Sequence, residues 1–280
     1  MVDGVTALPH PLTGGLFASP VPPGTGWPED PATPDTPVAH DPDDVRRLAS
    51  TPHLGELDAR VSVCSACPRL VAWREDVAHN KRASFADQPY WGRPIAGWGD
   101  PEAAVLIVGL APAANGGNRT GRVFTGDSSG DWLFASLHRV GLATQATSEH
   151  AGDGQRLVGA RMVATVRCAP PDNRPTTEER DTCGPWIRAE IAMLAPHLQV
   201  VVALGGYGWA GALGALAAAG YAVPRPLPKF GHLAEVTLAS EDRSVVLLGC
   251  YHPSQQNTFT GRLTAAMLDE VLGRAARMRP

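Results

Sequence analysis

Four short apolar runs rich in β-branched residues each precede a segment with helical patterning, and this alternation constrains the fold more than any other feature. The runs lie at residues 105–108, 162–166, 200–204 and 245–251. The helical segments that follow them lie at about residues 131–140, 177–193, 207–219 and 259–277. Strands that alternate with helices predict an α/β fold, a three-layer αβα sandwich around a central four-stranded parallel sheet.

The first part of the chain has a different composition. Residues 1–43 contain repeated prolines and almost no apolar periodicity, which predicts an extended N-terminal extension without a compact structure of its own. A helix start at about Asp41 marks the beginning of a single folded domain over residues 44–280. The apolar stretch from Val201 is broken by glycines, so a buried strand and helix are expected there and no membrane span. No secretory signal is visible, and we expect a cytoplasmic protein.

The charge is unevenly distributed along the chain. The formal net charge is −4, but residues 1–60 carry nine acidic and three basic residues, whereas the remainder carries 19 acidic and 21 basic residues. The folded part is therefore mildly basic. This balance excludes a globally basic nucleic-acid binder, but it permits a local positive groove.

One long loop carries the residues best suited to chemistry. The string GLAPAANGGNRTGRVFTGDSSG follows the first apolar run, at the strand's carboxyl end, where open α/β sheets bind ligands. Within it, Phe124 offers a stacking face, Asp127 a carboxylate, and Arg119 and Arg122 two guanidiniums for phosphate. These groups favour a nucleotide ligand, although the sequence after Asp127 would also suit a helix cap.

Four of the five cysteines have a spacing that suggests a metal site. Cys64 and Cys67 form a Cys-x-x-Cys pair, and Cys168 and Cys183 flank a proline-rich loop. In a cytosolic protein such spacing indicates metal or redox chemistry more often than a disulfide, and it fits a four-cysteine zinc site or an iron–sulfur cluster equally well. Cys250, at the end of an apolar run, is expected to be an ordinary core residue.

Two long strings resemble motifs of one enzyme family. The loop at residues 109–130 is similar to the first motif of the uracil-DNA glycosylase superfamily, in the version of its family 5 branch. The string YHPSQQNTFTGRLT, residues 251–264, looks like the family's HPS motif and DNA-intercalating loop. The resemblance covers roughly residues 62–272. It implies an αβα fold, a [4Fe-4S] cluster held by Cys64, Cys67, Cys168 and Cys183 with a structural role, and removal of uracil from DNA.

The resemblance also implies roles for individual residues. Phe124 should stack on the flipped base, Asp127 should stabilise the developing positive charge on the sugar or orient water, and His252 should support the leaving base. Asn173 could also hold water, because the family uses an asparagine in that loop, although it could equally be a turn residue. The DNA contacts expected are Arg119, Arg122, Gln255, Gln256, Asn257 and Arg262, with Phe259 in the intercalating wedge.

Three positions line the expected base pocket and differ from relatives. Ala111 stands where other branches of the superfamily have an acid that activates water, so this motif is catalytically silent there. Asn115 replaces a histidine that family 5 proteins usually have, and an amide carries no charge near pH 7. Ala164 stands where uracil-selective relatives have an asparagine, which favours a broader range of deaminated bases: hypoxanthine, xanthine and ethenocytosine besides uracil.

Three functions therefore remain open on the sequence. The first is a monofunctional glycosylase that acts, as a monomer, on DNA containing uracil or other deaminated bases. The second is a non-catalytic protein that binds damaged or single-stranded DNA through the same groove, which Asn115 makes more plausible. The third is a zinc protein with four thiolate ligands that binds nucleotides.

Overall fold

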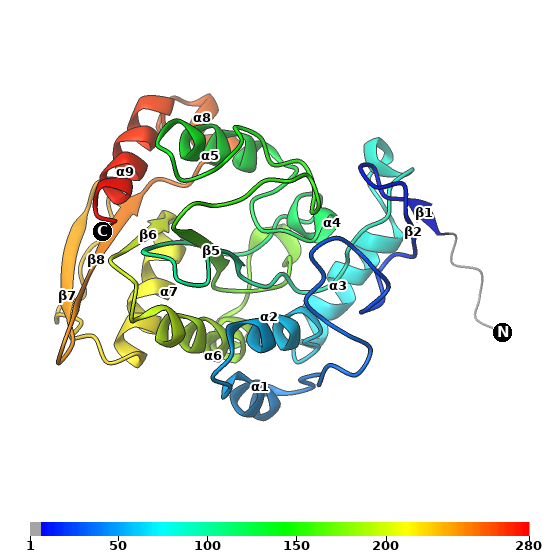
Figure 1. Ribbon diagram of the computed structural model, residues 1–280, viewed down its shortest axis with the longest axis horizontal. Coiled ribbons are helices and arrows are strands. Elements are labelled where there is room, and N and C mark those ends of the chain that lie inside the picture. The colour runs from blue at the N-terminus through cyan, green and yellow to red at the C-terminus, as the bar shows by residue number, and fades with distance from the viewer. Residues whose placement is uncertain (1–6, 280) are drawn as a thin grey trace.

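The computed structural model describes residues 7–279, and its centre is a mixed sheet of six strands in the order β3-β5-β4-β6-β8-β7 (Figure 1). β5, β4, β6 and β8 are parallel neighbours, whereas β3 and β7 pair antiparallel at the two edges. The strands of this sheet are β3 (Trp98–Gly99), β4 (Val105–Gly109), β5 (Ala160–Ala164), β6 (Val200–Leu204), β7 (Glu235–Ala239) and β8 (Ser244–Cys250).

The α/β class is confirmed, but the prediction that the sheet has four strands is wrong, because it has six. The four parallel strands are the four apolar runs of the sequence, and they are almost fully buried because helices cover both faces. The missed edge strands have a physical reason. β3 has only two residues, and four of the five residues of β7 are exposed or half-buried, so neither has a continuous apolar run.

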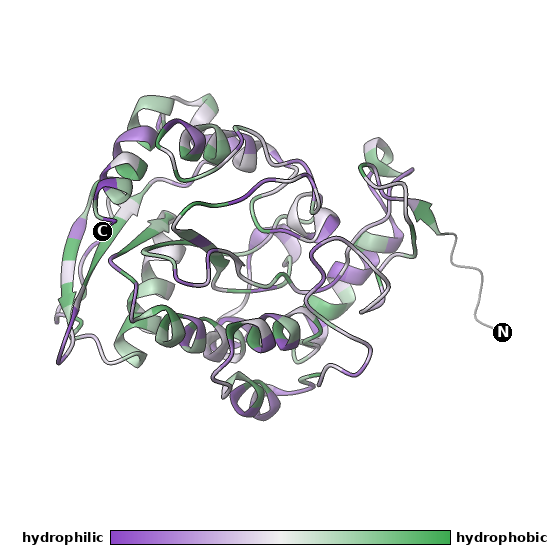
Figure 2. Ribbon diagram, viewed as in Figure 1, coloured by the Kyte–Doolittle hydropathy of each residue, from purple (hydrophilic) through white to green (hydrophobic). Residues whose placement is uncertain are grey.

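Helices form a layer on each side of the sheet, and Figure 1 shows α5 and α9 on one side and α2 and α6 on the other. One buried cluster joins α5 and α9 to the sheet, and a second joins α6 and α7 to the opposite face. In Figure 2 the central strands are largely hydrophobic, and the outer helices alternate hydrophobic and hydrophilic residues. The helices are α1 (Pro42–Ala49), α2 (Leu54–Ser62), α3 (Pro68–His79), α4 (Gly117–Thr120), α5 (Ser128–Arg139), α6 (Thr177–Leu194), α7 (Gly205–Ala218), α8 (Gln255–Phe259) and α9 (Ala265–Arg277), with short 3-10 turns at Ala83–Phe85 and Pro171–Asn173.

Local signals explain most helix boundaries. Thr176 and Glu179 form a capping box at the start of α6, and Asp41 caps α1. The last predicted helix begins later than expected, because residues 255–259 form the separate helix α8 and Thr264 caps α9. Within residues 7–279, none of the helices combines the length and the apolar character that a bilayer crossing requires.

The proline-rich extension follows an irregular path over the domain, and several of its apolar side chains are buried, although Leu12 and Leu16 are exposed. Its only regular structure among residues 7–41 is a small hairpin of β1 (Leu8–Pro9) and β2 (Leu16–Phe17). Phe17, Val21 and Trp27 belong to the same buried cluster as α5 and α9. Asp30 binds the buried guanidinium of Arg93 through two contacts of 2.9 Å. Although the segment has little periodicity, these aromatic and charged anchors fix it to the domain.

Candidate active site

The candidate site lies at the carboxyl ends of β4 and β8, where the two motif strings meet. Phe124 and His252 have ring centroids 5.9 Å apart, inclined by 38°. The Phe124 ring lies over Gly109, the last residue of β4, and a Cβ on that glycine would come within 2.6 Å of the ring. Phe124 itself has a positive φ of 50°, a conformation that costs free energy in a non-glycine residue. The loop is thus held so that an aromatic ring closes over the strand end.

Asp127 is both the N-cap of α5 and part of a solvent-filled cavity. Its Oδ1 accepts a hydrogen bond of 2.9 Å from the amide of Gly130. Burial raises the pKa of Asp127, while amide donors from Gly130 and Ser129 act in the opposite direction. Its other oxygen, Oδ2, lies against Gly116, where an added Cβ would come within 2.1 Å. Gly116, which the sequence reading missed, therefore leaves room for the carboxylate.

His252 follows β8 and is neutral in the folded protein. Burial lowers its pKa to about 4. Its backbone carbonyl accepts a hydrogen bond of 2.8 Å from the Asn257 side chain, which links the histidine to α8. A neutral imidazole at this position can donate one hydrogen bond to a ligand without adding a positive charge.

The three residues expected in the base pocket, Ala111, Asn115 and Ala164, differ in how far their side chains are buried. Ala164 is 2% exposed, ends β5 and pairs in register with Gly109. Its side chain belongs to the same buried cluster as Phe124. Ala111 is half-buried just beyond β4. Asn115 accepts a hydrogen bond of 2.8 Å from the Tyr90 hydroxyl, so its amide is tied to the domain.

The two arginines of the loop, which the sequence predicts to contact phosphates, are buried and bonded to other groups of the protein. Arg119 donates to Gln88, Asn115 and Gly126 and is 5% exposed. Arg122 is 1% exposed and pairs with Glu29 at 3.2 Å and with Asp153. In this structure the donors of both guanidiniums are therefore engaged within the protein. The sequence could not show this, because most of these acceptors come from distant segments.

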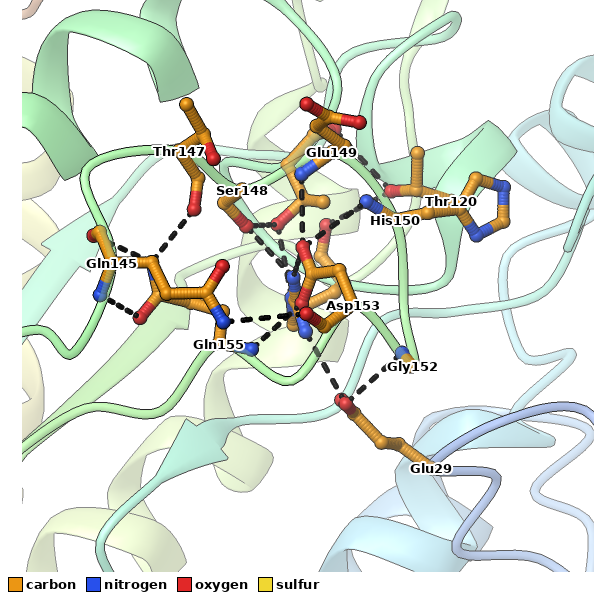
Figure 3. Close-up of polar contacts among 12 residues, drawn as sticks. Glu29, Thr120, Gln145, Thr147, Ser148, Glu149, His150, Gly152, Asp153 and Gln155 are labelled. Atoms are coloured by element: carbon orange, nitrogen blue, oxygen red, sulfur yellow. Dashed lines mark hydrogen bonds and ion pairs between the residues drawn. The ribbon is translucent and has the colours of Figure 1, made fainter. Parts of the chain in front are cut away.

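The Arg122 network joins the extension to the loop that carries Asp127. Figure 3 shows Glu29 directed at the amide of Gly152, to which it bonds at 3.1 Å, with Asp153 at the centre of the network. Arg122 also donates to Thr125 and Ser148. Ion pairs of this kind fix geometry even where their net contribution to stability is small. We assign Arg122 a role in positioning residues 122–127.

A cavity of about 340 Å³ lies on one side of Asp127, and the sequence did not predict it. Asp131 and Glu149 bring further carboxylates to its wall, and Pro11 and Leu12 of the extension close it. No motif could have shown that the extension reaches this place.

The expected wedge is largely exposed, and so is the expected water-holding residue, Asn173. Gln255, Gln256 and Phe259 are exposed on α8, with Phe259 80% exposed. Arg262 is also exposed, and its guanidinium lies 4.7 Å from the centre of the Tyr251 ring. Asn173 is exposed at the end of a 3-10 turn with φ 55°, and its side chain bonds to no described residue.

The four cysteines of the proposed metal site line one cavity between α3 and α6. Arg74 donates a hydrogen bond of 3.0 Å to Cys168 Sγ, and the Arg167 amide donates one of 3.3 Å to Cys183 Sγ. Burial, together with the neighbouring thiols, raises the pKa of Cys64 to about 11 and that of Cys67 to about 12. Without a cation these thiols are therefore protonated.

The four thiols line one small space without converging on a single point. Among residues 7–279, no group of three or more His, Cys, Asp or Glu side chains is arranged so that it could hold a metal ion. A zinc ion at about 2.3 Å from each sulfur would need four convergent thiolates. The four sulfurs instead border a space, and N–H donors already point at two of them. The two four-thiolate sites that the sequence allows, zinc and iron–sulfur, would use these same four cysteines.

Two buried histidines predict acid sensitivity. His150 is 1% exposed, both its ring nitrogens lack described partners, and burial lowers its pKa to about 3. In the folded protein both histidines stay neutral until the pH falls well below 6.5, whereas in the unfolded chain they bind protons near pH 6.5. Between these pH values the unfolded chain therefore carries more bound protons than the folded protein. We expect the urea midpoint to fall as the pH drops from about 6.5 toward 4.

His150→Phe tests this prediction, because phenylalanine fills the site without titrating. The variant should have a flatter dependence of the urea midpoint on pH, whereas the exposed control His197→Asn should follow the unmodified protein. Equal slopes in all three proteins would contradict the assignment.

The comparisons with known proteins agree with this geometry. The family model of the uracil DNA glycosylase superfamily matches residues 96–275. The chain is 55% identical to a type-5 uracil-DNA glycosylase of Mycobacterium tuberculosis over 270 residues, which are 96% of this chain and 98% of that protein. It is 48% identical to a type-5 uracil-DNA glycosylase of Thermus thermophilus over 218 residues, 78% of this chain and 94% of that protein. It is also 32% identical to a type-4 enzyme of Pyrobaculum aerophilum, but over only 41% of this chain and 51% of that protein.

Proposed function

The chain belongs to the uracil-DNA glycosylase superfamily and to its type-5 branch, and from this premise we propose that it hydrolyses the N-glycosidic bond of uracil in DNA and leaves an abasic site. The observation that carries the proposal is the meeting of Phe124 and His252 at the ends of β4 and β8, with Asp127 shortly after Phe124 as the N-cap of α5. A stacking face, a carboxylate and a neutral hydrogen-bond donor are the groups that this reaction requires.

The chemistry follows from where each group lies. The base leaves the stack and lies against Phe124, and the bond to the sugar breaks as positive charge develops on the sugar and negative charge on the base. Asp127 opposes the positive charge or orients the water that replaces the base. His252 donates a hydrogen bond to the departing base. Asn173 stays a second candidate for holding water, because the loop after β5 carries it.

The contacts with DNA are assigned to the exposed loop after β8. Gln255, Gln256, Asn257 and Phe259 form the wedge that fills the gap left by the base, and Arg262 contacts a phosphate. Because one chain supplies every group named here, we expect a monomer to suffice, and we expect it to act in the cytoplasm.

We propose further that Cys64, Cys67, Cys168 and Cys183 hold one [4Fe-4S] cluster. The shared cavity and the N–H donors to sulfur support it. Bound there, the cluster would link α3 to the start of α6 and the loop before it, a structural role, because the hydrolysis involves no electron transfer.

A direct test separates catalysis from binding alone. The purified protein is incubated with a duplex containing one uracil, and abasic sites are cleaved with alkali. Strand cleavage that depends on uracil supports the enzyme. Binding of the duplex without any abasic product would support the alternative, a non-catalytic DNA-binding protein, which Asn115 makes worth testing.

We also propose a broad range of bases, which Ala164 makes testable. Ala164 belongs to the same buried cluster as Phe124. Because its side chain is a methyl group, the pocket lacks an amide that would pair with uracil and reject a purine. We expect single-turnover cleavage of hypoxanthine, and weaker cleavage of xanthine or ethenocytosine, alongside that of uracil. Ala164→Asn should shift the ratio of rates toward uracil by about 10-fold or more.

Matched duplexes that differ only in the target base provide the comparison. Strict selectivity for uracil before any substitution would contradict the proposal. An unchanged ratio in a well-folded Ala164→Asn protein would do so too.

A further inference from the structure

A groove between α6 and α7 has no role in the site described above. Its volume is about 420 Å³, within the range of sites for small molecules. Arg180 and Arg188 of α6 form one wall, and Tyr207 of α7 stands at the other. The wall residues come from the first and middle turns of α6 and from α7 between Tyr207 and Ala215.

The groove is basic and has an exposed aromatic ring. Neither Arg180 nor Arg188 makes an ion pair with any residue that the structure describes. The Arg180 guanidinium lies 5.6 Å from the centre of the Tyr207 ring, which is 60% exposed. Asp181 is the one acidic residue among those lining the groove. The net positive charge of the groove therefore complements an anion, and the Tyr207 ring offers a stacking surface.

Glycines of α7 leave the base of the groove without side chains at those positions. α7 contains five glycines, and each costs about 1 kcal/mol relative to alanine inside a helix. At Gly211 a Cβ would come within 2.3 Å of Thr165, so packing explains that glycine. At Gly214 a Cβ would meet nothing within 4 Å, so packing does not explain it. A side chain there would instead project into the groove.

The groove lies on the α6 and α7 face of the sheet, and the start of α7 brings it close to His252. Thr165, in its wall, directly follows Ala164 of the base pocket. A Cβ on Gly205, two residues before Tyr207, would lie 3.4 Å from the Cβ of His252. A DNA strand that leaves the site on this side meets the groove next.

We propose that this groove binds the DNA strand that carries the target base, beside the flipped nucleotide. Tyr207 stacks on a base of that strand, and Arg180 and Arg188 contact its phosphates. This inference rests on the proposed function, because it assumes a DNA substrate. It adds a strand-binding surface on the opposite side of His252 from α8.

The test measures binding to a single strand of about 12 nucleotides without uracil, so it does not depend on base removal. Tyr207→Ala should raise the dissociation constant about 10-fold, because one stacked base is lost, and Tyr207→Phe should restore most of it. Arg188→Gln and Arg180→Gln should each lower the slope of log K against log salt by about 0.7.

Two further variants make the outcome decisive. Gly214→Gln adds a side chain to the groove floor and should weaken binding while leaving the melting temperature equal or higher, because glutamine favours a helix. Arg243→Gln removes an exposed charge at the opposite edge of the sheet, before β8, and should leave binding unchanged. Wild-type affinity in both Tyr207→Ala and Gly214→Gln would overturn the inference. Failure of the wild type to release uracil would instead overturn the proposed function.

Discussion

Asp127→Asn is expected to lower the single-turnover rate of uracil release by about 10² to 10⁴ while the protein still folds and binds uracil-containing DNA. The carboxylate has two functions in the structure, as the cap of α5 and as the charge that faces the site. Asparagine keeps the first function, because its side-chain oxygen can accept the hydrogen bond from Gly130. It loses the second, because it carries no charge.

The control for this experiment is Asp131→Asn in the first turn of the same helix. Asp131 is exposed and lines the same cavity as Asp127. Each variant therefore removes one negative charge, and the two positions are about one helical turn apart at the start of α5. We expect a change of less than 10-fold for Asp131→Asn. A near wild-type rate in Asp127→Asn would show that Asp127 is a helix cap and no more.

The pH dependence provides a second measurement of the same residue. Burial raises the pKa of Asp127 above its usual value near 3.8, so protonation begins at a higher pH than for an exposed aspartate. The single-turnover rate should fall as the pH drops through that raised pKa. In Asp127→Asn this acidic decline should disappear from the residual rate.

The fold was predictable where burial and periodicity coincide. The run at residues 200–204 matches β6 residue for residue, because a central parallel strand is apolar on both faces. The helix expected at residues 177–193 matches α6 within one residue, because Thr176 and Glu179 form its capping box. The edge strands β3 and β7 were not predictable in this way, because one is too short and the other is largely exposed.

The candidate site was predictable from its motifs but not from its supporting contacts. Phe124, Asp127 and His252 lie at the strand ends, as expected from strings that follow apolar runs. The burial of Arg122 depends on Glu29 and Asp153, which are 93 and 31 residues away in the chain. Sequence patterns contain local information only, so they cannot tell a guanidinium that binds phosphate from one that binds a buried carboxylate.

The largest effect on stability is expected at the cysteines. Cys183→Ser should remove the brown colour and most of the iron and sulfide from the purified protein, because serine is a poor ligand for iron. Since cluster binding contributes to folding, the melting temperature should fall by roughly 10 °C, which corresponds to about 3 kcal/mol for a chain of this size.

Cys250→Ser is the matched control, since Cys250 is equally buried but lies at the end of β8, outside the cavity of the other four thiols. Its Sγ bonds only to the carbonyl of Tyr251, at 3.3 Å, an interaction that a serine hydroxyl can also make. Iron and sulfide should therefore stay at wild-type levels in this variant. One zinc per chain without iron would refute the cluster and favour a zinc site of four thiolates, whereas equal iron in both variants would refute the cluster and leave the four thiols as packed core residues around a small cavity.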